Sequence, residues 1–183
     1  MELSAEIQAC SEGRHAAQQR LFNRYGERMF ALCYRYVKNK EDAEELMLNG
    51  FLNFFKTIHR FSFTGEASLS AWIRKIMVNE CLMFLRKKGR LRMVSLSEGP
   101  DLFVNAEIIG RLTAEEIYQL IVELPVGYRT VFNLYVIEGM SHRQIAAVLK
   151  ISEGTSKSQL SKARGLLQRM VEHNRVIREK TNH

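Results

Sequence analysis

Apolar residues recur three and four positions apart along most of this chain, the spacing that places them on one face of an α-helix. The first long stretch, residues 15–37, carries a stripe of Leu21, Tyr25, Met29, Leu32 and Tyr36. A polar break at 39–42 starts a second predicted helix that runs to about residue 58, and a third runs from about residue 69 to residue 88. Because the chain has only two prolines and few alternating apolar runs, the pattern favours an all-α protein.

The helical periodicity stops between residue 89 and about residue 112. Serine, glycine and proline gather there, a composition that is typical of a linker. The sequence therefore predicts an all-α fold of two small helical domains joined by a flexible linker. The predicted boundaries are 1–90 for the first domain, 91–112 for the linker and 113–183 for the second domain.

Local pairs of residues predict helix ends in the second domain. Thr113 and Glu116 have the spacing of a capping box, in which each side chain accepts a hydrogen bond from the other residue's backbone N–H. Pro125 suits the first position of the next helix, and Gly139 suits the left-handed residue that ends it.

Residues 139–164 have the pattern of a helix-turn-helix. Ser141 and Gln144 form another capping box, and Ser152, at the end of the turn, is placed to cap the second helix. The second helix has a predicted buried face of Leu160, Ala163 and Leu167 and an opposite face of Thr155, Ser158, Lys162 and Arg169, with Gln159 at its edge. A helix that is packed on one side and polar and cationic on the other suits the major groove of DNA. The alternative is a solvated amphipathic helix in a bundle.

Positive charge is concentrated in two separate regions. The formal net charge of the chain is +7, and residues 140–183 carry nine lysines or arginines against three acidic residues. A second cluster places five cations in the seven residues 86–92. Two such regions indicate two contacts with a polyanion, in the first place nucleic acid. Ordinary solubilising charge is the alternative for either region taken alone.

The predicted second helix carries two leucines outside its apolar face. Leu48 and Leu52 share a side of this helix with Glu41, Glu45, Asn49 and Lys56. Exposed apolar area flanked by carboxylates is typical of a protein docking site. The enzymatic alternative, acid–base or metal chemistry at Asp42, Glu44 and Glu45, lacks a histidine or further acid at a supporting spacing.

The connection before the third helix is polar and carries two aromatic residues, Phe61 and Phe63. Aromatic side chains in such a loop, beside cationic helices, can stack on unpaired bases or can plug the core beneath the loop. On the third helix, Lys75, Asn79 and Arg86 form a narrow polar stripe that leads into the basic run.

The cysteines and histidines do not indicate a metal or cofactor site. The three cysteines lie far apart with no CxxC pair, which favours a reducing cytoplasm, and Cys33 and Cys81 are expected in the core. The five histidines show no ligand spacing. No apolar run reaches the length of a membrane span, and the first residues do not resemble a signal peptide. We therefore expect no cofactor and a cytoplasmic location.

Together these features resemble the extracytoplasmic-function (ECF) sigma factors, the two-domain group of the sigma-70 family of bacterial RNA polymerase subunits. The first domain matches at 40–46, Phe51, Phe61, Gly65, 71–73, Asn79 and 85–86. The second matches at 124–125, 128–129, Phe132, 139–141, 144–146, Leu149 and 154–164. The resemblance implies a protein that catalyses no bond change, directs core RNA polymerase to specific promoters and assists promoter opening.

The resemblance also implies roles for individual residues. Docking on the clamp coiled coil of the largest polymerase subunit would use Asp42, Glu45, Leu48, Asn49 and Leu52. The −10 promoter element would be contacted by Phe61, Phe63, Gly65, Lys75, Asn79 and Arg86. The −35 element would be contacted by Thr155, Lys157, Ser158, Gln159, Lys162 and Arg164.

Further partners follow from the resemblance. The polymerase flap would accompany the clamp as a contact, and the linker would run toward the polymerase interior. Members of the group are typically silenced by an anti-sigma factor, often membrane-anchored, which lies between the two domains.

The chain departs from the family pattern at two places. Members usually carry glutamine and then an acid where this chain has Leu48 and Asn49, which predicts a more apolar polymerase contact. Many members have valine at the position of Ser156, which the helical spacing places on the buried face. We expect the Ser156 hydroxyl to bond a backbone carbonyl.

Two other classes of function compete with this interpretation. A transcription regulator that binds an operator as a dimer would explain the helix-turn-helix but not the acid-flanked leucines. A helical adaptor that binds only protein would use its positive charge for solubility alone. An enzyme is the least favoured class.

Overall fold

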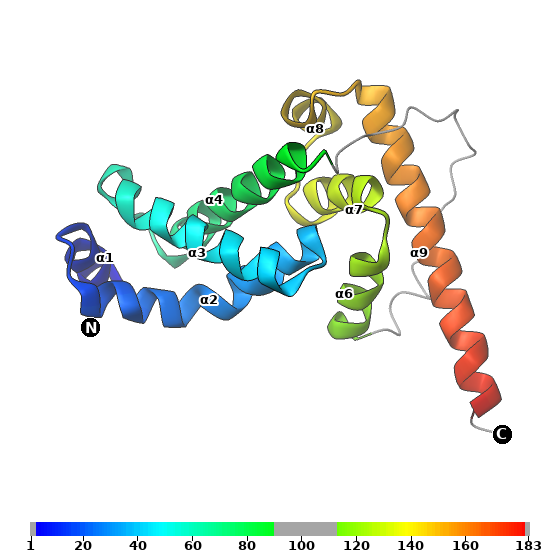
Figure 1. The fold of residues 1–183 in the computed structure, drawn as a ribbon, viewed down its shortest axis with the longest axis horizontal. Helices are drawn as coiled ribbons and strands as arrows, with labels where there is room; N and C mark the ends of the chain where they lie inside the picture. Colours follow the sequence, from blue (N-terminus) through cyan, green and yellow to red (C-terminus); the bar gives the residue numbers. More distant parts are fainter. Residues whose placement is uncertain (1–2, 90–112, 182–183) are drawn as a thin grey trace. The chain divides into compact units, whose positions relative to one another are not determined.

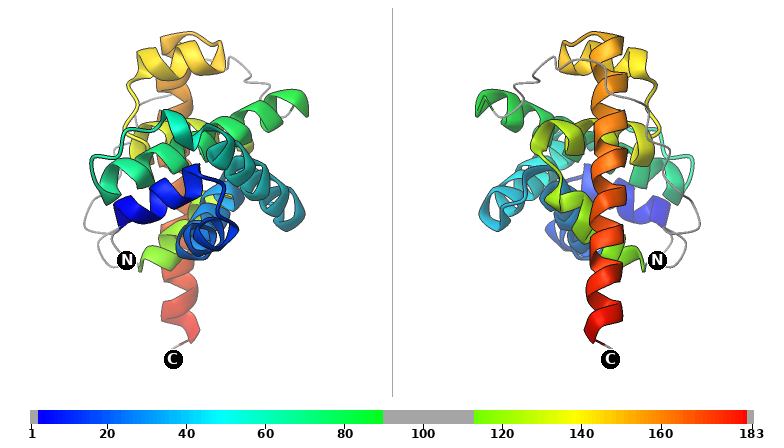
Figure 2. Two further views of the ribbon diagram at one scale, coloured as in Figure 1. Left: turned by 90° about the vertical axis from the view of Figure 1, so that its left-hand side faces the viewer. Right: turned by 90° about the vertical axis from the view of Figure 1, so that its right-hand side faces the viewer.

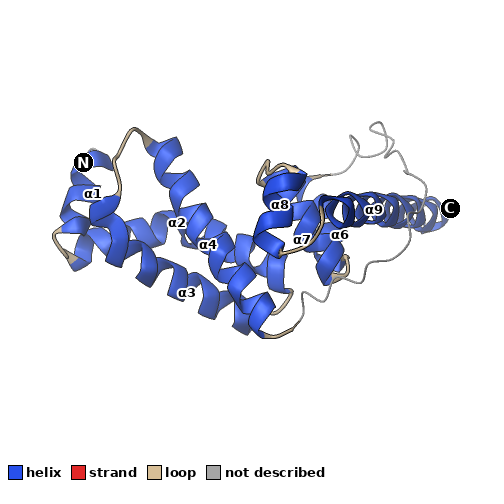
Figure 3. Cartoon of the chain, turned by 90° about the horizontal axis from the view of Figure 1, so that it is seen from above, coloured by secondary structure: helices blue, strands red, loops and turns tan. Residues whose placement is uncertain are grey.

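The computed structural model describes residues 3–89 and 113–181, and every regular element within these ranges is helical (Figures 1 and 3). The chain divides into two compact units, Met1–Lys87 and Lys88–His183, here called the N-terminal and C-terminal units. The predicted all-α fold is therefore confirmed. The predicted linker, residues 91–112, lies outside the described residues.

The N-terminal unit is a bundle of α2, α3 and α4, which all pack against one another, with α1 lying on α2. The elements are α1 (Leu3–Ser11), α2 (His15–Val37), α3 (Lys40–Thr57), the 3₁₀ turn η1 (Ile58–Arg60) and α4 (Glu66–Lys87). The ends of α2 coincide with the predicted ones. Helix α1 was not predicted; Ile7 and Cys10 are buried, and an ion pair between Glu6 and Arg20 (2.6 Å) ties it to α2.

Helix α4 begins at Glu66, three residues before the predicted start. The Ser68 hydroxyl donates a hydrogen bond to the Gly65 carbonyl (2.7 Å), and the backbone N–H of Leu69 donates to the same carbonyl. Gly65 has a φ of +138°, a conformation that favours glycine. These local bonds extend the helix into a stretch without apolar periodicity.

The core of the N-terminal unit brings α3 and α4 into close approach at Gly50. Cys33 and Cys81 are fully buried in this core, as predicted. A Cβ atom on Gly50 would overlap the Met77 Sδ atom, and Met77 is itself fully buried. The absence of a side chain at residue 50 therefore sets the distance between the two helices.

We expect Gly50→Val to destabilise the protein by about 2 kcal/mol, because the added side chain would overlap the fully buried Met77 side chain and force it to shift. Urea unfolding followed by circular dichroism measures the loss. Gly26→Ala is the matched control, since a Cβ there would make ordinary contacts of 3.8 Å with the Phe22 ring. Equal unfolding midpoints for Gly50→Val and the unaltered protein would show that the close approach is unimportant.

The C-terminal unit contains α6 (Ala114–Glu123), α7 (Val126–Phe132), the π-helical turn η2 (Asn133–Ile137), α8 (His142–Leu149) and α9 (Glu153–Thr181). Both predicted capping boxes form, at Thr113 with Glu116 and at Ser141 with Gln144. Gly139 is left-handed as predicted, with a φ of +69°. Pro125 precedes α7 as its N-cap instead of being its first residue.

Helix α9 organises the C-terminal unit. It packs on α6, α7 and α8 and continues to residue 181 as one helix, drawn orange to red in Figure 2. The shared core of α6 and α9 consists of Leu120, Ile121, Leu124, Ala163, Leu167 and Val171. The buried Arg129 guanidinium donates to the Val122 and Leu124 carbonyls (2.6 and 3.0 Å), which satisfies the end of α6.

Neither a membrane span nor a metal cluster is found where the structure is described. Within residues 3–89 and 113–181, no helix combines the length and the apolar character needed to cross a bilayer. In the same ranges, histidine, cysteine and acidic side chains do not gather in groups of three or more that could hold a metal ion.

Candidate polymerase-docking and nucleic-acid interfaces

Helix α3 carries a patch of acidic, amide and apolar side chains. We call Asp42, Glu45, Leu48, Asn49 and Leu52 the α3 patch. Its two leucines are 50% and 57% exposed, and Glu45 and Asn49 are also exposed. The start of α3 is fixed by Asn39, whose side chain accepts a hydrogen bond from the Asp42 backbone N–H (2.7 Å). The exposure of Leu48 and Leu52 agrees with the prediction from helical spacing.

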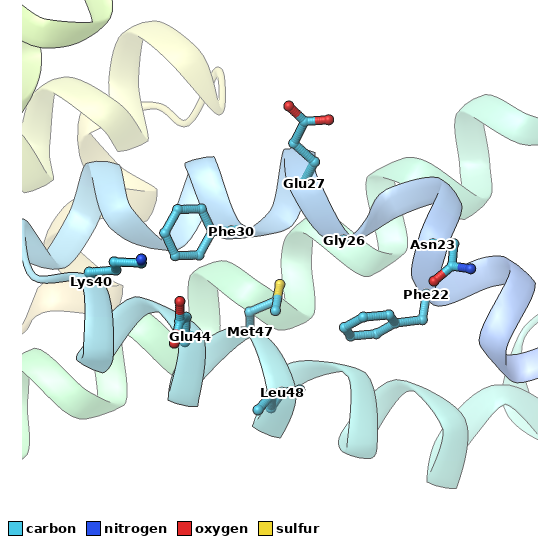
Figure 4. A pocket seen from close by; sticks show the side chains of 9 residues that line it. All are labelled: Phe22, Asn23, Gly26, Glu27, Phe30, Lys40, Glu44, Met47 and Leu48. Atoms are coloured by element: carbon cyan, nitrogen blue, oxygen red, sulfur yellow. The ribbon is translucent and has the colours of Figure 1, made fainter.

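A cavity of about 630 Å³ lies between α2 and α3 beside this patch (Figure 4). Its lining consists of Phe22, Asn23, Gly26, Glu27, Phe30, Lys40, Glu44, Met47 and Leu48. Phe22, Phe30 and Met47 supply apolar walls, and Leu48 belongs both to the cavity and to the α3 patch. The α2 side of this surface was not predicted, because the spacing within α3 does not tell which helix lies beside it.

The loop between η1 and α4 is held by a row of aromatic rings. The Phe61 ring stacks on the Trp72 ring with centroids 4.7 Å apart and planes 3° from parallel. Phe63 meets Phe61 edge to face at 6.5 Å, and Trp72 meets Phe54 of the core at 5.2 Å. One face of Phe61 is thus covered by the protein, while both loop aromatics keep part of their surface exposed.

Helix α4 presents a polar and cationic stripe to solvent. Lys75, Asn79 and Arg86 are all exposed, in agreement with the prediction from their spacing. Met83 lies on the same stripe, four residues after Asn79, and is 48% exposed. Met83 was not predicted as part of this stripe, although extending the spacing of the stripe by one turn would have found it.

The helix-turn-helix is formed by α8 and the first part of α9. Lys150 adopts the left-handed conformation that ends α8, with a φ of +57°. The Ser152 hydroxyl accepts a hydrogen bond from the Thr155 backbone N–H (2.9 Å), so Ser152 caps α9 as predicted. The predicted contact residues that have exposed or partly exposed side chains are Thr155, Lys157, Ser158, Lys162 and Arg164.

Gln159 does not lie at the edge of the exposed face, and that prediction is wrong. Its side chain is only 5% exposed. It packs against α7, where a Cβ on Gly127 would lie 3.2 Å from the Gln159 Oε1 atom. The glycine lets the amide approach the α7 backbone, so we leave Gln159 out of the proposed DNA contacts.

Ser156 is buried as predicted, but its partner is different. The hydroxyl lies 2.9 Å from the His142 Nδ1 atom instead of bonding a backbone carbonyl. The His142 ring also stacks on Tyr135, with centroids 4.5 Å apart, and the Arg164 guanidinium lies 5.9 Å from the Tyr135 ring centroid. These four side chains, here called the His142 cluster, join η2, α8 and α9.

Two family models match this chain, and together they cover both units. Residues 21–91 match sigma-70 region 2, and residues 114–167 match sigma-70 region 4. The N-terminal match contains the α3 patch and the stripe on α4, and the C-terminal match contains the helix-turn-helix.

Proteins similar to this chain are ECF RNA polymerase sigma factors. The ECF RNA polymerase sigma factor SigE of Mycolicibacterium smegmatis is 30% identical over 151 residues, which cover 79% of this chain and 57% of SigE. The ECF RNA polymerase sigma factor SigW of Bacillus subtilis is 25% identical over 194 residues, covering 93% of this chain and 97% of SigW. This chain therefore spans little more than half of SigE but nearly all of SigW.

Two solved structures share the fold. CnrH in complex with the cytosolic domain of CnrY has a TM-score of 0.50 and 19% identity, covering 92% of this chain and 96% of that chain. The sigma factor RpoE in complex with the anti-sigma factor NepR from Bartonella quintana has a TM-score of 0.50 and 22% identity, covering 84% and 96%.

The two regions of one family occur in the expected order, on a helical fold with an exposed helix-turn-helix. These features define a transcription initiation factor. The chain belongs to the ECF group of the sigma-70 family of RNA polymerase sigma factors.

Proposed function

We propose that this sigma factor docks on core RNA polymerase through the α3 patch and contacts the two promoter elements with separate units. The observation that carries the proposal is the contrast between two exposed surfaces of the N-terminal unit. The leucines of α3 are flanked by carboxylates, whereas the stripe on α4 is cationic and runs into further cations. Acidic surroundings favour a basic protein surface, and cationic surroundings favour DNA.

The −10 element is assigned to the N-terminal unit. The contact residues are Phe61, Phe63, Gly65, Lys75, Asn79 and Arg86. Opening a duplex costs stacking and pairing energy, and aromatic side chains that bind the unpaired bases offset part of that cost. The stack of Phe61 on Trp72 supports this role because it fixes one ring in place before DNA arrives.

The −35 element is assigned to the C-terminal unit. Its contact residues are Thr155, Lys157, Ser158, Lys162 and Arg164, which lie on the first turns of α9. A recognition helix places the residues near its N-terminus against base edges in the major groove, while the preceding helix crosses the DNA backbone. The factor lends promoter recognition to the polymerase and catalyses no reaction itself.

We further propose that the chain acts in the cytoplasm and is held inactive by an anti-sigma factor. One solved relative is bound to an anti-sigma factor, and another to the cytosolic domain of a second protein. The exposed leucines of the α3 patch supply apolar area that such a partner would cover in competition with polymerase.

Competition with the principal sigma factor for core polymerase tests the docking proposal. The labelled principal factor is bound to core enzyme, the present chain is added in increasing amounts, and fluorescence anisotropy reports displacement. We expect this chain to displace the labelled principal factor fully from core polymerase at saturation. A chain that binds promoter fragments by itself as a dimer and displaces no principal factor would be an ordinary regulator instead.

A further inference from the structure

Within the His142 cluster, His142 contacts Ser156, which lies 14 positions further along the chain. Ser156 is fully buried. A buried hydroxyl without a partner costs free energy, and here it is satisfied by the His142 Nδ1 atom at 2.9 Å. The serine thus orients the imidazole, and stacking on Tyr135 holds the ring plane.

The other ring nitrogen of His142 has no comparable partner. Within the described residues, Nε2 takes part in no hydrogen bond, and the His142 side chain is partly exposed. His142 is the first residue of α8, the helix that crosses the DNA backbone in a helix-turn-helix. Nε2 is therefore the atom that is left for an external ligand at the edge of the DNA-facing surface.

The charges around His142 suit an anionic ligand. Lys157 and Arg164, both from α9, are the cations that act on it, and Glu153 of α9 is the opposing carboxylate. Tyr135 faces the ring from η2, with the two ring centroids 4.5 Å apart. Arg143 adds a further cation on α8 itself.

We propose that His142 binds a backbone phosphate of the −35 element through Nε2, takes up a proton when it does so, and is positioned for this by Ser156. The inference rests on the proposed function. In the complex both ring nitrogens donate hydrogen bonds, Nδ1–H to the Ser156 oxygen and Nε2–H to a phosphate oxygen. The serine bond survives protonation because a hydroxyl can rotate from donor to acceptor. A valine at residue 156 could not accept this bond.

The direction of the pH effect follows from the environment of the ring. Burial, followed by the charges of Lys157 and Arg164, lowers the pKa of His142 below its usual value, so the free protein favours the neutral ring. A bound phosphate adds negative charge and raises this pKa. The gain in promoter affinity is therefore fully present below the pKa of the free protein and is lost as pH rises through the pKa of the complex.

The test measures binding of the holoenzyme to a promoter fragment at constant ionic strength. The fragment is one from which the holoenzyme initiates. For each protein, the promoter affinity at about pH 6 is divided by the affinity at about pH 8. This ratio should be about fivefold larger for the unaltered protein than for His142→Gln. The titration of one proton can change the affinity by at most tenfold per pH unit. Glutamine keeps a donor near the position of Nε2 but cannot titrate. His173→Gln is the control, since it replaces an exposed histidine of α9 that lies outside the His142 cluster.

A second variant tests the positioning role of serine. We expect Ser156→Val to reduce the pH dependence toward that of His142→Gln, because valine cannot accept the bond from Nδ1–H. Thermal unfolding checks that the variant is folded. Equal pH ratios for the unaltered protein and His142→Gln would overturn the inference and leave the proposed function standing. A holoenzyme that initiates at no promoter at any pH would instead refute the proposed function.

Discussion

Leu48→Asp and Leu52→Asp should each weaken the association of this sigma factor with core polymerase by about thirtyfold, equivalent to about 2 kcal/mol. Each substitution removes an exposed leucine from the α3 patch and replaces it with a charge that would be buried in the complex. The expected effect is larger for Leu48, because this residue also lines the cavity between α2 and α3 (Figure 4). Competition with the labelled principal sigma factor measures both affinities.

The control for this experiment is Ala16→Asp, which adds the same charge at an exposed position of α2 outside the patch. All three variants should unfold at nearly the same temperature, since none of the altered side chains is buried in the free protein. Core polymerase that binds Leu48→Asp as tightly as Ala16→Asp would place the docking surface elsewhere.

Lys157→Ala and Arg164→Ala should each weaken binding of the holoenzyme to its promoter by about fivefold, with similar losses on every promoter sequence. Contacts with phosphate position the protein but carry no base information. Each lost phosphate contact should also lower the slope of log affinity against log salt concentration by about 0.9. Filter binding over a salt series measures both quantities on the same samples.

Arg28→Ala is the matched control, because it removes one exposed positive charge from α2 of the other unit. It should leave the salt slope unchanged. If all three variants reduced affinity and slope equally, the positive charge would act only through the net charge of the protein. Thr155→Ala and Ser158→Ala should differ from the cation variants by changing the preference among −35 sequences.

Local signals made the helices and their ends predictable. Capping depends on residues three positions apart, and both boxes, at Thr113 and at Ser141, form as their spacing indicates. The exposed leucines of α3 followed from the spacing within a single long helix. Most predictions that needed only one helix and its caps were therefore confirmed, the exceptions being the start of α4 and the place of Pro125 before α7.

Predictions that needed a neighbouring helix failed. The apolar face of α9 was predicted correctly. However, α7 covers the edge of α9 where Gln159 lies, and His142 of α8 is the partner of Ser156. Helical spacing tells which face is buried but not which element covers its edge. Helix α1 was missed for a related reason, because only Ile7 and Cys10 among its apolar residues are buried and much of its attachment is an ion pair.

We propose above all that this chain gives core polymerase its choice of promoter. The most direct test of this proposal is transcription of fragmented genomic DNA by core polymerase with and without the purified chain, with the 5′ ends of the transcripts sequenced. We expect a limited set of new start sites that share two upstream elements at a fixed separation. The same start sites with and without the chain would contradict the proposal.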